Sequence, residues 1–305
     1  MELNLLEFKH KIVSVKRFTD LQNDIDVLLS GNKLSNNRVF RSYIDTKKFI
    51  IPEEFPDAKS VIVIAKKTRV AYIDFAYKGK IHNLLLPSPY YDDGTKIEDV
   101  EKYIFGEIFH QSKLESPYKI QRTKNLFLKT LAVRSGLSKY GRNNISYVTE
   151  MGSFYDLYSY FTDYIPENYD WSNERLMDLC ESCTICTNVC PTSAIREEEF
   201  VIDVDRCLPL YNEVQGEFPS DLPSDIHHTL MGCVRCQFAC PANKNMITNP
   251  RYFQPITERE TRMVLEGRKN KRLARRLCKK LKMFPYEYYD HYLPVLQRNL
   301  LVLLK

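Results

Sequence analysis

The chain has 305 residues, of which 44% are hydrophobic, enough for one large domain or for two unequal ones. Lys and Arg outnumber Asp and Glu by 44 to 39, and the resulting net charge of +5 does not by itself imply a nucleic-acid partner. Charges interrupt every apolar stretch of residues 1–18, so no secretory signal is expected. No run approaches the roughly 20 apolar residues that span a bilayer. These features predict a cytoplasmic protein that does not enter a membrane.

The first part of the chain is expected to mix strands and helices. Residues 58–66 are apolar and rich in β-branched side chains, which is typical of a buried strand. Apolar residues fall at helical spacing over 97–111, a second helix is expected over about 124–134, and 145–148 resembles another strand. Residues 1–172 are therefore predicted to form an α/β or α+β domain.

Eight of the nine cysteines lie between positions 180 and 240, and none precede them. This clustering indicates metal ligands in a reducing compartment more than a disulfide scaffold. Residues 173–250 are therefore expected to form a second domain in which metal clusters replace much of a hydrophobic core. Residues 251–305 are expected to be a helical, basic C-terminal tail.

The first cysteines follow the pattern C-x2-C-x2-C-x3-C-P, at Cys180, Cys183, Cys186 and Cys190. This is the bacterial ferredoxin run, in which three thiolates hold one 4Fe-4S cluster and the fourth reaches a second cluster. Thiolates are the soft ligands that iron-sulfur clusters require. The pattern predicts two clusters in a ferredoxin-like domain.

A shorter run, C-x2-C-x3-C-P, begins at Cys233 and has Leu230 where a leading cysteine would stand. Cys207 is the candidate for the missing ligand, because Cys278 lies far along a basic helix and is expected to be a free structural thiol. The crossing rule then assigns Cys180, Cys183, Cys186 and Cys240 to cluster 1, and Cys190, Cys207, Cys233 and Cys236 to cluster 2. Two zinc sites are the alternative, although the triple run suits them poorly.

Two clusters preceded by about 170 residues suggest that the clusters transfer electrons to a redox site in the first domain. No G-x-G-x-x-G follows a predicted strand, no P-loop is present, and the chain has only 10 Gly, so a dinucleotide-binding domain is not expected. A flavin or a corrinoid remains open as the acceptor.

Several stretches resemble the epoxyqueuosine reductases and their relatives, and together they cover residues from about 50 to 245. The resemblance implies a nitroreductase-like α/β domain that binds cobalamin base-off, without a protein ligand to cobalt, and a cofactor that is reduced through the two clusters. Reductive dehalogenases are similar in plan. The matching stretches are 57–65, 131–144, 152–154, 205–210 and 231–243.

The resemblance also implies site residues on the matched loop. Arg142, Asn143, Asn144 and Ser153 are the candidates to hold the amide side chains of cobalamin. Tyr140 or Tyr147 is the candidate proton donor, because a Tyr has this role in the dehalogenases.

One position departs from the family pattern. The epoxyqueuosine reductases carry an Asp proton donor about nine residues before a Leu-Ala pair, and ungapped matching places Arg122 there in this chain. The departure favours a relative with a different or unknown substrate.

Two further features carry open interpretations. His227 and His228 nearly match a corrinoid-ligand motif, but the spacing fails, and a loop position beside cluster 2 is expected instead. Residues 268–282 hold nine Lys or Arg and no acid, in the pattern of an amphipathic helix. Its cations are expected to face solvent, or to contact the phosphates of tRNA or an acidic electron donor.

The main functional prediction is a cobalamin-dependent reductase of unknown substrate, either a small molecule or tRNA. Electrons would reach the corrinoid through the two clusters from a low-potential donor such as ferredoxin or flavodoxin. One alternative is a non-catalytic electron carrier or reductive activator for a corrinoid or flavin protein. The other alternative is an epoxyqueuosine reductase that acts on tRNA.

Overall fold

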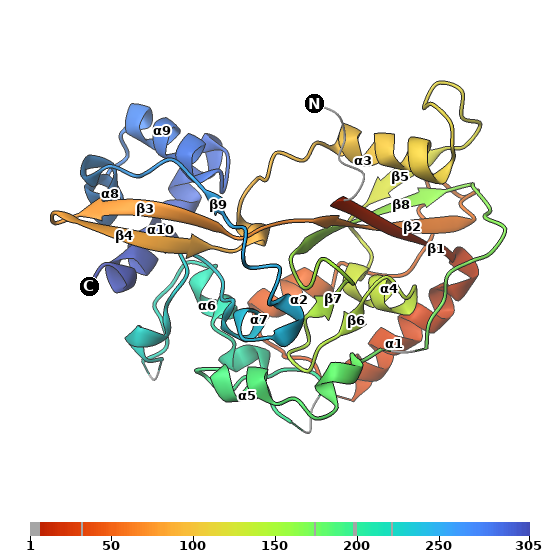
Figure 1. Cartoon of the computed structure of the whole chain (residues 1–305), viewed down its shortest axis with the longest axis horizontal. Coiled ribbons are helices and arrows are strands. Elements are labelled where there is room, and N and C mark those ends of the chain that lie inside the picture. The colour runs from red at the N-terminus through yellow and green to blue at the C-terminus, as the bar shows by residue number, and fades with distance from the viewer. Residues whose placement is uncertain (1–6, 32, 174, 198–199, 221) are drawn as a thin grey trace. The chain divides into compact units, whose positions relative to one another are not determined.

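The computed structural model describes residues 7–31, 33–173, 175–197, 200–220 and 222–305 (Figure 1). Two compact units divide these residues. Unit 1 takes its residues from 1–67, 94–184 and 197–201, and unit 2 takes its residues from 68–93, 185–196 and 202–305. The chain therefore crosses between the units several times.

A four-stranded antiparallel sheet forms the centre of unit 1, in the order β1-β2-β8-β5. The predicted strand at 58–66 is confirmed as β2. Its side chains alternate between two cores: Val61 and Val63 face one, and Ile62 and Ile64 face the other. The four strands are β1 (Phe8–Ser14), β2 (Ser60–Lys67), β8 (Tyr155–Thr162) and β5 (Ile120–Thr123).

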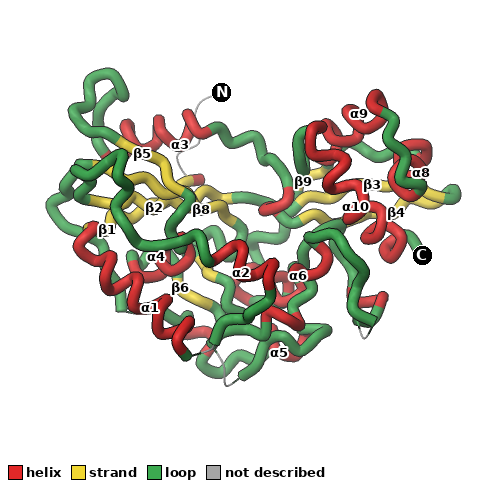
Figure 2. The backbone as a smooth tube through the Cα atoms, turned by 180° about the vertical axis from the view of Figure 1, so that it is seen from behind, coloured by secondary structure: helices red, strands yellow, loops and turns green. Residues whose placement is uncertain are grey.

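Helices cover both faces of this sheet, as Figures 1 and 2 show. α1 (Phe18–Ser30) and α4 (Leu128–Arg134) pack on one face, and α3 (Ile97–Tyr103) packs on the other and continues as a π-helix over Ile104–Ile108. The helix predicted over 97–111 is thus present, whereas the helix predicted from about 124 begins four residues later. Unit 1 also contains α2 (Arg38–Ile44) and a short hairpin of β6 (Lys139–Tyr140) and β7 (Ser146–Tyr147).

Unit 2 is built on the antiparallel hairpin of β3 (Ala71–Tyr77) and β4 (Lys80–Leu86), with β9 (Arg251–Tyr252) parallel to β3. Three helices pack against the hairpin: α8 (Glu258–Leu265), α9 (Lys271–Leu281) and α10 (Tyr289–Leu303). Three short helices lie in the cysteine-rich segment: α5 (Ile185–Val189), α6 (Pro209–Asn212) and α7 (Arg235–Phe238).

Residues 251–305 are not a tail. Leu277 and Leu281 of α9 are almost fully buried and share one core with Ile73 and Phe75 of the hairpin. The apolar face of the predicted amphipathic helix therefore packs against strands that lie about 200 residues earlier in the sequence. The boundaries of the two units also differ from the expected domain ranges 1–172, 173–250 and 251–305. The reason is that the hairpin at 68–93 belongs to the same unit as the C-terminal helices. The mixed α/β character of the fold is confirmed.

Candidate metal centre

Unit 2 contains four cysteines that lie within electrostatic reach of Cys207 or are Cys207 itself: Cys190, Cys207, Cys233 and Cys236. Burial raises the pKa of the Cys207 thiol, and the other three thiols are close enough to raise it further. Cys190 follows α5 and Cys236 lies on α7, and these two short helices pack together. These are the four residues predicted from sequence to hold cluster 2. Leu230 is fully buried in the core of unit 2, at the position where another ligand would stand in the longer motif.

The turn that precedes Cys233 is held by buried polar side chains. The Asn212 side chain makes two hydrogen bonds to the backbone of Gly232. Its amide nitrogen donates to the Gly232 carbonyl at 2.7 Å, and its oxygen accepts from the Gly232 N–H at 2.9 Å. Asn299 of α10 donates to the carbonyls of Asn212 at 2.8 Å and Leu230 at 3.0 Å. All these polar groups are satisfied without water, so the turn is held in one conformation. No pattern in the sequence singles out either asparagine.

A buried tyrosine and glutamate lie beside the same turn. Tyr90 donates a short hydrogen bond to the Glu213 carboxylate. Burial raises the pKa of both groups, and for Tyr90 the nearby Glu213 adds to the rise. Because Cys207 and Cys233 also act on Tyr90, this pair lies within electrostatic reach of the thiols.

Two polar groups approach the sulfur atoms of this group. The backbone N–H of Ala194 donates to Cys190 Sγ at 3.3 Å, and N–H···S bonds of this kind tune cluster potentials. His228 Nε2 lies 3.9 Å from Cys233 Sγ and accepts from the Val234 N–H at 3.3 Å. Its Nδ1 therefore carries the proton and donates to the Ile226 carbonyl at 3.2 Å. His228 thus lies in the loop beside the predicted cluster 2.

In unit 1, Arg142 holds the start of the cysteine-rich segment. Its guanidinium donates to three backbone carbonyls: those of Cys183 at 3.0 Å, Cys180 at 2.5 Å and Glu197 at 2.9 Å. Cys180 and Cys183 are two of the ligands predicted for cluster 1. A planar guanidinium suits this fork of acceptors, which Lys cannot match. The guanidinium nitrogens of Arg142 are thus engaged by the backbone of the cysteine-rich segment, and its role toward cobalamin stays a prediction.

The other predicted cobalamin residues also have partners within the protein. The Asn143 side chain accepts from the Ile145 N–H at 3.2 Å and donates to Tyr147 Oη at 2.9 Å. The Asn144 side chain donates to the Phe200 carbonyl at 3.2 Å and accepts from Lys129 Nζ at 2.8 Å. Ser153 is half-buried in the turn after Gly152.

The two candidate proton donors lie on the short β6–β7 hairpin. Tyr140 pairs with Ser146 and Tyr147 pairs with Lys139, so the two rings project from opposite faces. Both residues are buried. Burial raises the pKa of Tyr140, and its ring lines a cavity of about 330 Å³ together with Thr130. The structure therefore does not bring the two tyrosines to one site.

Lys129 is a half-buried cation that no pattern in the sequence singles out. Its Nζ donates to the carbonyl and the side-chain oxygen of Asn144 at 2.7 and 2.8 Å, and it lies 5.5 Å from the centre of the Tyr140 ring. Burial lowers the pKa of Lys129 to about 8. An amine with this pKa exchanges protons near neutral pH.

Arg122, at the position of the family's Asp, lies on the edge strand β5. It is exposed, and its guanidinium lies 5.6 Å from the centre of the Tyr158 ring. It offers no carboxylate, so the structure does not restore the missing donor at this position.

The basic helix α9 uses two of its cations internally. Arg276 and Lys280 bond the fully buried Glu260 carboxylate, at 2.7 Å each. Burial acts to raise the pKa of Glu260, but hydrogen bonds from Lys280, Thr257 and Arg276 outweigh it and lower the pKa to about 2. Lys271, Arg275 and Lys279, spaced four residues apart, remain exposed along one stripe.

Three further findings concern metal and membrane sites. Cys278 is a free, buried thiol on α9, as expected. Within the described part of the chain, no three His, Cys, Asp or Glu side chains converge as they would around one metal ion. None of the helices in the described ranges has both the length and the apolar character of a bilayer span.

A family model described as a 4Fe-4S double cluster binding domain matches residues 179–243. The match includes all eight clustered cysteines, and it supports iron-sulfur clusters over the zinc alternative. Which cysteine binds which cluster stays a prediction.

Curated relatives share the name epoxyqueuosine reductase. The protein of Cyclobacterium marinum is 28% identical over 175 residues, which cover 52% of this chain and 55% of that protein. The protein of Escherichia coli is 33% identical over 129 residues, 42% of this chain and 33% of that protein. The matches thus span between a third and about half of these relatives.

Solved structures show the same fold over nearly the whole chain. An epoxyqueuosine reductase of Bacillus subtilis, described with its Asp catalytic loop swung out of the active site, superposes with a TM-score of 0.66 at 20% identity, covering 97% of this chain and 77% of that one. An epoxyqueuosine reductase with a modified tRNA stem loop has a TM-score of 0.64 at 20% identity, covering 97% of this chain and 76% of that one.

These comparisons confirm the resemblance to epoxyqueuosine reductases and correct the main functional prediction. A cobalamin-dependent reductase of unknown substrate is the wrong choice, because the relatives and structural neighbours reported above are all named for epoxyqueuosine. The alternative predicted from the sequence, an epoxyqueuosine reductase, agrees better with them. The Arg at position 122 is thus a local departure within a match that extends over much of the chain.

Proposed function

We propose that this chain, which is epoxyqueuosine reductase-like in sequence and fold, reduces the epoxide of epoxyqueuosine in tRNA with electrons from two 4Fe-4S clusters. The observation that carries the proposal is a double-cluster segment at 179–243 within a fold that matches epoxyqueuosine reductases over 97% of the chain. Reduction of the epoxide to an alkene takes two electrons and two protons, and the oxygen leaves as water. The electrons come from a low-potential one-electron donor such as a ferredoxin or flavodoxin.

The eight cysteines are proposed to hold the clusters by the crossing rule. For cluster 2, support comes from the position of all four cysteines in unit 2, where three of them lie within electrostatic reach of Cys207. Each cluster passes one electron at a time. The assignment is Cys180, Cys183, Cys186 and Cys240 for cluster 1, and Cys190, Cys207, Cys233 and Cys236 for cluster 2.

The resemblance implies cobalamin, and the contacts of the residues expected to hold it test whether they can bind it. Arg142, Asn143 and Asn144 use their polar groups on the cysteine loop, on Tyr147 and on the Phe200 carbonyl. These side chains do not fit the role of binding the amides of a corrin. We therefore derive no step through cobalamin.

Of the two candidate proton donors, Tyr140 is favoured over Tyr147. Tyr140 lines a cavity of about 330 Å³, and the protonated amine of Lys129 lies beside its ring. Tyr147 instead accepts a hydrogen bond from Asn143 in a buried position. A tyrosine hydroxyl supplies a proton to a developing alkoxide in the way that a carboxylic acid would.

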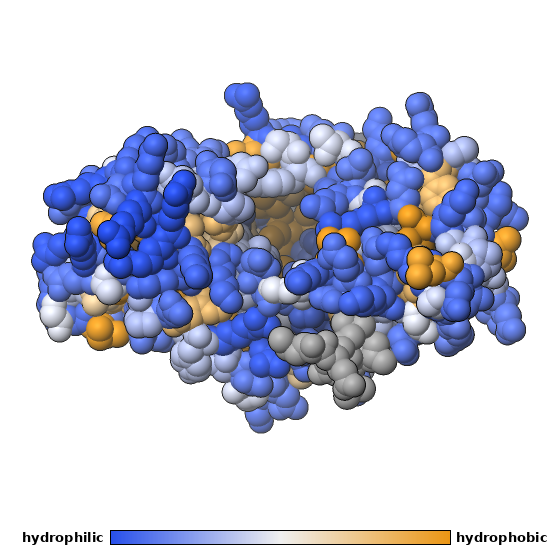
Figure 3. Space-filling model, turned by 90° about the horizontal axis from the view of Figure 1, so that it is seen from above, coloured by the Kyte–Doolittle hydropathy of each residue, from blue (hydrophilic) through white to orange (hydrophobic). Residues whose placement is uncertain are grey.

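The exposed stripe of α9 is proposed to contact the RNA backbone. Lys271, Arg275 and Lys279 are free of the Glu260 site and follow one side of the helix. Figure 3 shows hydrophilic side chains over much of the face that carries this helix. Cations in such a row neutralise successive phosphates and release counterions.

Genetic complementation tests the proposal. The gene is expressed in a strain that lacks its own epoxyqueuosine reductase, and tRNA nucleosides are analysed by mass spectrometry. Conversion of epoxyqueuosine to queuosine is expected, and a variant with Cys207→Ser should abolish it. Accumulation of epoxyqueuosine despite soluble protein that retains both clusters would contradict the proposal.

A further inference from the structure

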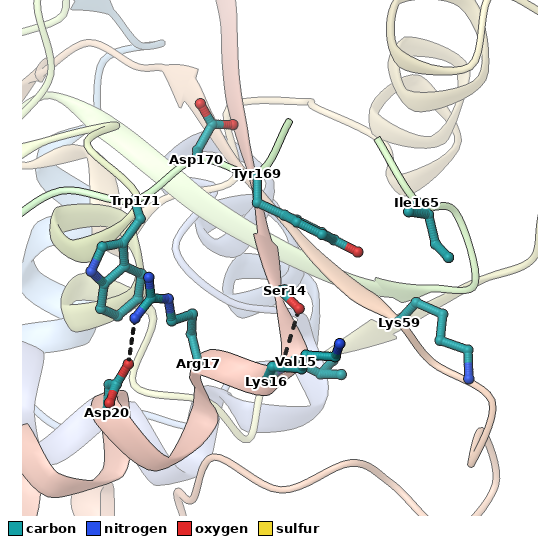
Figure 4. A pocket seen from close by; sticks show the side chains of 10 residues that line it. All are labelled: Ser14, Val15, Lys16, Arg17, Asp20, Lys59, Ile165, Tyr169, Asp170 and Trp171. Atoms are coloured by element: carbon teal, nitrogen blue, oxygen red, sulfur yellow. Dashed lines mark hydrogen bonds and ion pairs between the residues drawn. The ribbon is translucent and has the colours of Figure 1, made fainter. Parts of the chain in front are cut away.

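One cavity of unit 1 is lined by none of the cysteines discussed above as cluster ligands. It is open to solvent and has a volume of about 810 Å³, within the range of small-molecule sites (Figure 4). Its walls come from the end of β1, the start of α1, the residue before β2, and the segment that follows β8.

The walls of this cavity are held by specific contacts. The Val15 N–H donates to the Lys59 carbonyl at 3.1 Å, so the backbone next to Lys16 is joined to Lys59. On the other side, the Asp170 N–H donates to the Ile12 carbonyl at 2.8 Å, which anchors the segment that carries Tyr169.

The only Trp of the chain, Trp171, forms one wall, and two guanidinium groups lie over its ring. Arg17 lies 4.7 Å and Arg134 lies 4.8 Å from the centre of its ring. Arg134 is fixed in turn by Asp24, at 2.8 Å. The cavity is therefore lined by a rigid aromatic group, with Arg17 against it (Figure 4).

The charges that line the cavity do not balance. Arg17 pairs with Asp20 at 3.0 Å, and Asp170 pairs with Lys11 at 2.7 Å. Lys16 and Lys59 have no ion-pair partner among the described residues. Two positive charges are thus left over in a concave site, which favours a ligand with about two negative charges.

Tyr169 adds an aromatic surface. Its ring extends across the cavity in Figure 4, and the residue is 39% exposed. Arg17 and Arg134 already lie over the Trp171 ring, whereas Tyr169 presents a partly exposed ring for stacking.

We propose that this cavity binds a nucleotide, with the base stacked on Tyr169 and the phosphate held by Lys16 and Lys59. Base stacking on an aromatic ring beside cations is how proteins commonly hold single-stranded nucleotides. The nucleotide is either free or part of an RNA strand, and the chemistry of the site is the same in both cases. The site does not rest on the proposed epoxide reduction.

Because Trp171 is the only Trp, its fluorescence reports the occupancy of this cavity directly. The anaerobically purified protein with its clusters is titrated with AMP, adenosine, inorganic phosphate and a short single-stranded RNA. Equilibrium dialysis with labelled AMP measures binding independently of fluorescence. Saturable binding of AMP, or of the RNA alone, is expected, with adenosine and inorganic phosphate each much weaker. The first result identifies a free nucleotide as the ligand, and the second identifies a nucleotide within a strand.

Variants separate the two halves of the site. Lys16→Ala with Lys59→Ala should weaken binding roughly tenfold or more, whereas Lys102→Ala with Lys124→Ala, an equal charge change elsewhere on unit 1, should not. Tyr169→Ala should weaken binding about fivefold or more, and Tyr169→Phe should retain it. Equal affinity for AMP and adenosine, equal affinity for AMP and phosphate, or no binding of any probe would overturn the proposal.

Discussion

Tyr90 packs its ring directly over Gly232, the residue before Cys233, so that a Cβ on Gly232 would lie 2.3 Å from the ring. Gly232 also has a φ of +74°, in the left-handed region that side chains rarely adopt. The turn that presents Cys233 therefore depends on the absence of a side chain for two independent reasons.

Alanine substitutions at Gly232 and Gly79 separate backbone strain from the steric clash with Tyr90. Gly79 has a similar φ of +72° but open space around it, so Gly79→Ala measures backbone strain alone, about 1–2 kcal/mol. Gly232→Ala should lower the free energy of unfolding by at least about 3 kcal/mol, because overpacking against Tyr90 adds to the strain. Denaturant unfolding under argon checks this, and equal losses for the two variants would show that Tyr90 moves aside at little cost.

Arg142 is predicted to secure cluster 1 through its three carbonyl bonds. Arg142→Gln removes the fork and leaves the Cys180, Cys183 and Glu197 carbonyls without that donor. Iron content after desalting should fall from about eight toward about four atoms per chain. Arg122→Gln makes the same charge change on an exposed strand and should retain the full iron content. If both variants keep their iron, Arg142 has no role in holding the loop.

Cys207 is predicted to be the fourth ligand of cluster 2, although it lies outside both cysteine runs. Cys207→Ser should lower the iron content to about four atoms per chain, because serine is a poor ligand for this cluster. Cys278→Ser removes the free thiol in the core of unit 2 and should leave about eight. Iron and sulfide analysis together with electron paramagnetic resonance checks both, and a full complement of iron in Cys207→Ser would mean that another residue supplies the ligand.

The lowered pKa of Lys129 predicts that the stability of the protein depends on pH. Its pKa is about 8 in the folded chain and 10.5 in the ordinary state, so between these values the unfolded chain binds the proton and the folded chain does not. The free energy of unfolding should therefore rise as the pH increases from about 8 to about 10.5, by up to about 3 kcal/mol. Lys129→Met has no such group and should lack this part of the rise. The contribution of Lys129 is the difference between the two pH profiles from denaturant unfolding, and parallel profiles would mean that its pKa is not lowered.

Local patterns predicted the elements whose signals are contained in a few neighbouring residues. β2 was found because five consecutive apolar residues, Val61 to Ala65, are buried between two cores. The cysteine runs were found because their spacing itself encodes the cluster geometry. The basic helix was found from the periodicity of its leucines.

The contacts that sequence reasoning missed join residues that lie far apart in the chain. Glu260 bonds two cations of α9 from 16 and 20 positions away, and Asn299 bonds the peptide of Asn212 from 87 positions away. Glu and Asn also occur at many exposed positions, so residue type alone does not reveal that these two side chains are buried. Arg142 was assigned to a cofactor because the matched loop suggested one, while its carbonyl partners could be seen only in three dimensions.

The measurement that tests the central proposal most directly is a turnover assay under argon. Protein that carries both clusters is mixed with a tRNA stem loop containing epoxyqueuosine and a low-potential one-electron reductant, and the nucleosides are analysed by mass spectrometry. The proposal predicts a product that is lighter than the substrate by one oxygen atom, formed only when the clusters are reduced, and absent in Cys207→Ser. Reduced clusters with unchanged epoxyqueuosine, both with and without added cobalamin, would contradict it.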